Sequence, residues 1–129
     1  MKTEARYELP IFSSGLKEDP IIETKNLNVK LVLDGYDDED QEKKVIIQFE
    51  NVLCYKYTST SFTQTLYGAY DKIVELMESE WLNELKQVNK DKFNYWGLKH
   101  YVLYLDGIGL YQFIAQRYET TVVLIEQQM

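Results

Sequence analysis

Two segments with a two-residue period flank a run of acidic residues in the first half of the chain. Apolar side chains occupy every second position from Leu27 to Leu33, and again from Val45 to Phe49. This alternation is typical of strands with one face in the core and the other in solvent. The segment between them, 34–42, contains six acidic residues. The pattern therefore predicts a β-hairpin with a solvated acidic tip.

The same period predicts how this hairpin is extended and preceded. Alternation continues from Phe49 to Tyr57, which predicts one long second strand with a bulge or bend at Glu50-Asn51. Residues 5–11 also alternate, and they contain Pro10. Because proline has no amide hydrogen to donate, this first strand is expected at a sheet edge.

The last third of the chain predicts a second hairpin. The apolar segments 98–105 and 110–118 flank a turn that contains Gly107 and Gly109, and glycine readily adopts the positive φ of tight turns. Both faces of these two strands are apolar, so they are expected at the centre of the sheet, covered on both sides. The β-branched segment 120–125 is a candidate for a last strand.

Between the two hairpins the hydrophobic period changes. Apolar residues from Leu66 to Val88 fall on one stripe about 120° wide at about 100° per residue, which predicts one principal helix. Trp81 lies at the centre of that stripe, and its replacement by alanine is expected to cost about 3–5 kcal/mol. A second version remains open, in which 69–77 is extended and only 79–87 is helical, with Ser79 as the N-cap.

These elements predict a single α+β domain over residues 1–129. We expect one antiparallel sheet of about five to six strands with one principal helix packed on one face, in the order β-β-β-α-β-β and with a further strand at the end. A length of 129 residues and an apolar fraction of 45% are ordinary for one globular domain.

The net charge limits the class of partner. The chain has 14 basic and 21 acidic residues, a net charge of −7, so phosphate backbones and anionic lipid surfaces would repel it. We therefore expect no nucleic acid and no membrane partner, and a basic protein surface is the favoured partner. A homodimer that buries the second apolar face of the central strands is a further hypothesis.

Cysteine and histidine usage argues against disulfides and metal sites. The chain has one cysteine, Cys54, and one histidine, too few for an intrachain disulfide or a zinc framework. No cofactor motif is present. Residues 1–10 lack an apolar signal core, and no apolar stretch has the length of a membrane span. These features predict a cytoplasmic protein without a bound metal or cofactor.

His100 is the first candidate for acid–base chemistry because imidazole titrates near neutrality. It lies on a predicted central strand among apolar residues, however, where a buried neutral imidazole with hydrogen-bond partners is the commoner arrangement. Enzymatic activity is therefore not the favoured prediction. The alternative is a small-ligand-binding or enzymatic domain with a cleft between sheet and helix, in which His100 and Tyr104 supply polar groups. Pairing of Cys54 with His100 for nucleophilic catalysis has no supporting motif.

The acidic hairpin tip is the strongest candidate for partner binding. Its contiguous acids and the early position of Gly35 do not fit an EF-hand calcium loop. Tyrosine is abundant, with 11 residues, and exposed tyrosine is enriched at protein interfaces. We therefore expect a basic protein to bind at Tyr36, Asp37, Asp38, Glu39 and Asp40.

One resemblance supports this hypothesis. The segments SEWLNEL (79–85), LKHYVLYLDG (98–107) and YQFIA (111–115) resemble small Bacillus-type proteins that are uncharacterised or immunity-like. Immunity proteins of bacterial polymorphic toxin systems are small, acidic and cytoplasmic, and they neutralise often basic toxin domains by binding them. The resemblance implies no catalytic residue. The leading hypothesis is thus a non-enzymatic, acidic protein-binding module of the immunity type.

Overall fold

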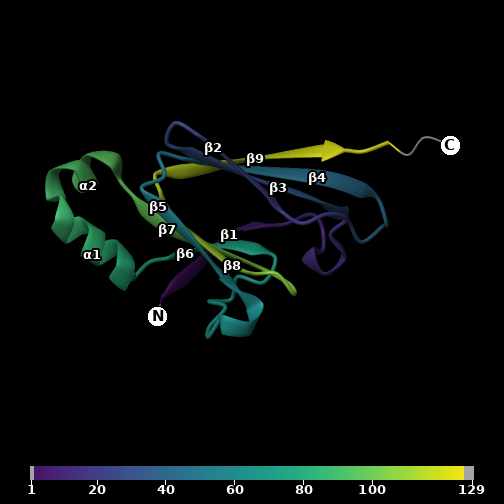
Figure 1. Cartoon of the computed structure of the whole chain (residues 1–129), viewed down its shortest axis with the longest axis horizontal. Coiled ribbons are helices and arrows are strands. Elements are labelled where there is room, and N and C mark those ends of the chain that lie inside the picture. Colours follow the sequence, from purple (N-terminus) through teal and green to yellow (C-terminus); the bar gives the residue numbers. More distant parts are fainter. Residues whose placement is uncertain (1, 127–129) are drawn as a thin grey trace.

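The computed structural model describes residues 2–126, which form two antiparallel sheets packed face to face (Figure 1). One sheet has five strands in the order β1-β6-β7-β8-β5, and the other has four in the order β2-β3-β4-β9. The strands are β1 (Thr3–Glu8), β2 (Ile21–Lys25), β3 (Asn28–Tyr36), β4 (Glu42–Glu50), β5 (Cys54–Ser59), β6 (Lys72–Leu76), β7 (Lys99–Leu105), β8 (Gly109–Ala115) and β9 (Arg117–Leu124). The helices are α1 (Glu80–Val88) and α2 (Lys90–Trp96), with short 3-10 turns at Ser13–Gly15 and Thr60–Phe62.

The prediction of a single sheet was wrong. The segment 45–57 is not one long strand, because β4 and β5 belong to different sheets. The expected bend lies at Asn51, whose φ of 52° turns the chain, and the chain passes there from one sheet to the other. The apolar alternation continues past Asn51 because Tyr55 and Tyr57 of β5 have the same parity as the core residues of β4. On this edge strand, however, the two tyrosines are 41% and 49% exposed.

The main core lies between the two sheets. The inward residues of β3 and β4, which the alternation identified, pack against the inward residues of β7 and β8. At its centre the ring of Phe49 stacks on that of Phe113, with 3.9 Å between ring centroids. Both side chains are fully buried, and their aromatic contact joins the two sheets.

A smaller core covers the other face of the five-stranded sheet. It contains Val74, Val102, Tyr104 and Leu110, and the loop residue Ala69 completes it. As predicted, β7 and β8 are therefore buried on both faces and lie inside the sheet. The homodimer interface expected on this second face is already occupied within the chain.

The prediction of one principal helix over 66–88 was also wrong. The alternative, an extended segment within 69–77 followed by a helix capped by Ser79, is confirmed. Residues 72–76 form β6, and α1 begins only after Ser79. The side chain of Ser79 accepts a hydrogen bond from Leu82 N at 3.0 Å, which makes it the N-cap. The helical period misled because β6 is buried on both faces: Ile73 enters the main core and Val74 the smaller one. Such a strand shows no alternation.

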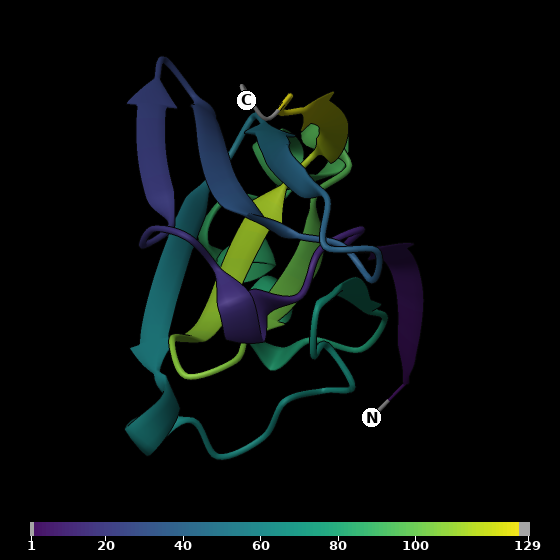
Figure 2. The same cartoon turned by 90° about the vertical axis from the view of Figure 1, so that its right-hand side faces the viewer.

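The second helix, α2, was not predicted from the sequence. Asn89 caps its first turn by accepting from Lys92 N, and Gly97 ends it with a φ of 61°. Figures 1 and 2 show both helices at one end of the sandwich, while the β3–β4 hairpin tip lies at the opposite end. Neither helix is long and apolar enough to cross a bilayer.

Trp81 is less buried than the helical stripe suggested. Its ring is half-buried on α1, stands edge-on to His100 at 5.3 Å between centroids, and lies 4.2 Å from Lys56 Nζ. The loss of about 3–5 kcal/mol expected from the sequence assumed a fully buried ring. Because part of the ring contacts water, Trp81→Ala leaves a smaller cavity and should cost less than that.

Candidate binding surfaces

Asp37 organises the acidic hairpin tip from inside. Its Oδ1 accepts hydrogen bonds from Glu39 N and Gln41 N, both at 2.9 Å, and its Oδ2 lies 2.8 Å from Lys43 Nζ. The hydrogen bond from Lys43 and those from the backbone amides lower the pKa of Asp37 to about 2. This carboxylate is buried and fully engaged. It shapes the tip and has no free oxygen to offer a partner.

The other residues proposed for partner binding are arranged unequally. Asp38, Glu39 and Asp40 are exposed at the tip. Tyr36 is half-buried in β3, where it pairs with Glu42 of β4. The structure therefore leaves three of the five proposed residues accessible as charges.

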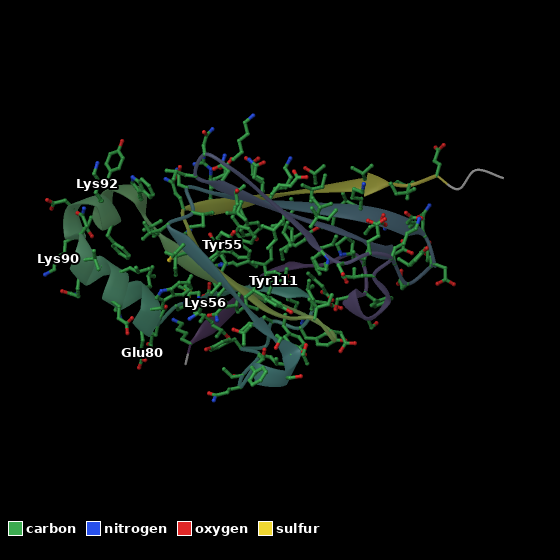
Figure 3. The ribbon with its side chains drawn as sticks, in the orientation of Figure 1. Tyr55, Lys56, Glu80, Lys90, Lys92 and Tyr111 are labelled. Carbon is green, nitrogen blue, oxygen red and sulfur yellow. The ribbon has the colours of Figure 1, made fainter. Side chains whose placement is uncertain are left out.

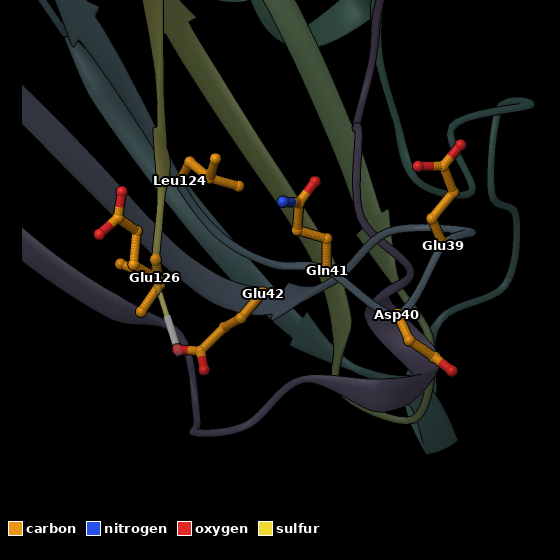
Figure 4. A pocket seen from close by; sticks show the side chains of 7 residues that line it. Glu39, Asp40, Gln41, Glu42, Leu124 and Glu126 are labelled. Carbon is orange, nitrogen blue, oxygen red and sulfur yellow. The ribbon is translucent and has the colours of Figure 1, made fainter. Parts of the chain in front are cut away.

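Beside the tip lies a concave surface of about 630 Å³, which we call the acidic hollow (Figure 4). The hairpin contributes residues 39–42. The last residue of β9, Leu124, and the next two residues, Ile125 and Glu126, complete the lining. The two segments are held together where Ile125 N donates to Glu42 O at 3.0 Å. The lining thus combines four carboxylate side chains with the aliphatic side chains of Leu124 and Ile125. The sequence analysis did not identify Leu124, Ile125 and Glu126 as part of this surface, because only the β4–β9 register brings them to the hairpin.

The hollow keeps an excess of negative charge. Lys43 is paired with Asp37, and Lys17 lies 3.4 Å from Glu42. Within residues 2–126, the ion pairs include neither Glu39 nor Asp40. Behind the hollow, burial and the nearby Glu42 carboxylate raise the pKa of Asp34. The surface is therefore suited to a cation.

His100 lies elsewhere, in a closed polar network. The hydroxyl of Ser79 accepts from Leu82 N and is 2.6 Å from His100 Nδ1, while His100 Nε2 is 2.9 Å from Gln112 Oε1. Because the amide oxygen of Gln112 can only accept, Nε2 carries the ring proton and Nδ1 accepts from Ser79. All three side chains are buried. The serine–histidine contact thus caps α1 and is closed to a substrate.

Burial lowers the pKa of His100 below its usual value, which predicts a specific pH dependence. Below about pH 6.5 the unfolded chain binds a proton that folded His100 does not. The free energy of unfolding should therefore decrease as the pH falls from 7 towards the folded pKa. Urea denaturation of wild type and His100→Gln over this range tests it, because the variant should lack this part of the decrease. Equal slopes in the two proteins would contradict the assignment.

A second concave surface, the apolar hollow, lies between the helices and the start of β5. It measures about 490 Å³ and is lined mainly by Leu85 and Val88 of α1, Phe93 and Trp96 of α2, and Leu53 and Leu98. Lys92, labelled in Figure 3, supplies the one basic side chain among its lining residues. Cys54 also lines it, and burial raises the pKa of the thiol, which disfavours the reactive thiolate.

The residues proposed for a ligand cleft do not line this hollow. His100 is closed in its network, and Tyr104 is buried in the smaller core, where its hydroxyl donates to Thr60 Oγ1 at 3.3 Å. Among residues 2–126 there is also no group of three or more His, Cys, Asp or Glu side chains placed to hold a metal ion. The sheet–helix junction is therefore concave and apolar, without an assembled polar site.

Comparison with known proteins adds no constraint on function. No protein family, no curated protein and no solved structure matches this chain.

Proposed function

We propose that this protein is a non-enzymatic binding module that holds a basic protein partner in the acidic hollow. The observation that carries the proposal is that Glu39, Asp40 and Glu126 line one hollow together with the aliphatic side chains of Leu124 and Ile125. Lysine and arginine have an aliphatic stem and a charged end. A basic side chain entering the hollow can therefore place its stem on Leu124 or on Ile125, which point to opposite faces of the sheet, while its charge meets a carboxylate.

The net charge of the chain supports the same partner. At −7 the domain attracts a basic protein over several ångströms, and such steering raises the association rate more than it slows dissociation. An inhibitor that must capture a basic toxin domain quickly benefits from this property. An immunity-type role is the specific form of the proposal, and it rests on the sequence resemblance and on the sign of the charge.

The first test is capture of a partner and its response to charge removal. Tagged protein should retain a basic protein from lysate at low salt and release it at higher salt. With that partner, the triple variant Glu39→Gln, Asp40→Asn, Glu126→Gln should associate about tenfold or more slowly and show a flatter salt dependence. Stopped-flow or surface-plasmon-resonance kinetics measure both quantities.

A matched control removes the same charge from the opposite end of the molecule. Glu80, Glu84 and Asp91 are exposed on α1 and α2, and their replacement by Gln, Gln and Asn changes the net charge equally. This control should bind almost as fast as wild type. If both triple variants slow association equally, only the total charge matters and the acidic hollow is not the binding site.

Small-ligand binding is the alternative function. The apolar hollow is the observation that favours it, because its volume of about 490 Å³ falls within the usual range for ligand pockets. A ligand there would contact Trp96 and Cys54, and neither His100 nor Tyr104. We place this function second because the surface has few polar groups to orient a ligand.

A further inference from the structure

Strand β9 presents an open edge to solvent. One side of it pairs with β4 from Lys43↔Leu124 to Glu50↔Arg117, and no strand among residues 2–126 pairs with its other side. Ile125 N donates to Glu42 O, which fixes the direction of each amide. Since amides alternate along a strand, those of Thr121 and Val123 also point to β4, and those of Thr120, Val122 and Leu124 point to the open edge.

The second half of this edge, residues 120–124, lacks the protection that the other three sheet edges have. Exposed edges usually carry a charged residue, a proline or a bulge that blocks pairing with another chain. The β2 edge has Glu23 and Lys25, and the β5 edge has Lys56. The β1 edge has three charged residues and a register irregularity between Ala5 and Tyr7. Arg117 and Glu119 lie in the first half of β9, whereas residues 120–124 have none of these features.

The last three residues of β9 also expose apolar side chains on both faces of the sheet. Val122 and Leu124 share the inner face of their sheet with Val45, yet they are 44% and 50% exposed because the five-stranded sheet does not cover them. On the outer face Val123 is 41% exposed. Figure 1 shows this end of β9 extending beyond the other sheet. A neighbouring strand would therefore bury apolar side chains on both faces and pair the free amides.

We propose that two copies of this chain pair through β9, antiparallel and about a two-fold axis, and so join their four-stranded sheets into one continuous sheet. Directly opposed residues of antiparallel strands lie on the same face, so a two-fold axis perpendicular to the sheet requires pairs of equal parity. Pairing about Val122, for example, sets Thr120 opposite Leu124 and Thr121 opposite Val123. This pairing brings no like charges opposite each other between residues 120 and 124.

The effect of salt separates this dimer from the binding of a basic partner. Each copy carries a net charge of −7, so long-range repulsion opposes dimerisation and salt should strengthen it. Binding of a basic protein at the acidic hollow should instead weaken with salt. Both proposals use Leu124, but the dimer rests on the open strand edge and not on the carboxylates of the acidic hollow, so the opposite responses to salt distinguish them.

Sedimentation equilibrium of the full chain tests the dimer. Protein up to about 1 mM should approach twice the 15.3 kDa monomer mass, with a dissociation constant at least a few-fold lower in about 0.5 M NaCl than in about 0.05 M. Val123→Lys should remain monomeric, because it places two lysines close together across the pair. Ile21→Lys, on the outer edge of the same sheet, makes the same charge change and should dimerise like wild type or better.

A second variant removes only the outward amide. Val122→Pro deletes a donor that faces the open edge and leaves the β4 ladder intact, a position where proline is tolerated in sheets. It should be monomeric, with a far-ultraviolet circular dichroism spectrum like that of wild type. A wild type that stays monomeric at the highest concentration and salt overturns the proposal. So does a dimer that persists in Val123→Lys.

Discussion

Replacing Phe49 by alanine should lower the free energy of unfolding by about 3–5 kcal/mol. The side chain is fully buried between the sheets, stacks on Phe113, and has Tyr101 and Tyr118 within 5.9 and 6.1 Å between ring centroids. These neighbours belong to three different strands. They cannot all collapse into the space that the ring leaves, so the variant keeps a cavity and loses most of the aromatic contact between the sheets.

Urea denaturation measures this loss, and Tyr55→Ala is the matched control. Tyr55 also stacks on Phe113, at 5.8 Å between centroids, but from the edge strand β5 with 41% of its surface exposed. The control should lose less, about 1–2 kcal/mol, because a smaller part of its side chain leaves water when the chain folds. The denaturation slope should be the same in all three proteins. A loss at Phe49 no larger than at Tyr55 would mean that the two sheets are not joined through this ring.

The strands of the hairpins were predictable because their environment is uneven. In β3 and β4 one face packs against the core and the other contacts water. Apolar and polar residues therefore alternate with a two-residue period in the sequence. The turn at Gly107 and Gly109 was recognisable for a related reason, since both glycines have positive φ. Local chemistry decides these features, and no knowledge of distant contacts was needed.

The division into two sheets was not predictable from the sequence. Residues 45–57 keep one parity although β4 and β5 lie in different sheets, and only pairing with distant strands distinguishes the two. The helical period assigned to β6 failed for the converse reason, because burial on both faces removes alternation. Periodicity reports whether a face is buried and does not report which element covers it.

In the candidate site, too, the features set by local sequence were predictable, and those set by distant contacts were not. The acidic tip, including Glu39 and Asp40, could be identified from its composition. The role of Asp37 could not, because its burial depends on Lys43 and on two backbone amides that only the folded hairpin brings together. The contribution of Leu124 and Ile125 to the acidic hollow depends on the pairing of strands about 80 residues apart.

The second large effect is expected at Gly109, the first residue of β8. Its φ is 147°, and a Cβ there would collide with the carbonyl oxygen of Thr58 and approach Tyr57 Cε2 to 2.8 Å. The Thr58 oxygen is backbone of β5, the partner strand of β8, so no rotamer change relieves the contact. Gly109→Ala should therefore cost at least about 3 kcal/mol, from strain at positive φ together with displacement of β5.

Gly107→Ala separates these two contributions, because Gly107 lies in the same turn with a φ of 69° but has no atom within 4 Å of the position that an added methyl group would occupy. It should cost only about 1–2 kcal/mol, the strain of a left-handed conformation. Thermal and urea denaturation of both variants give the comparison. Hydrogen exchange should show lost protection along β5 in Gly109→Ala alone, since β8 is the one strand among residues 2–126 that pairs with β5. Equal losses in the two variants would mean that β5 moves aside freely, and that this edge of the five-stranded sheet is held far less tightly than its ladder with β8 implies.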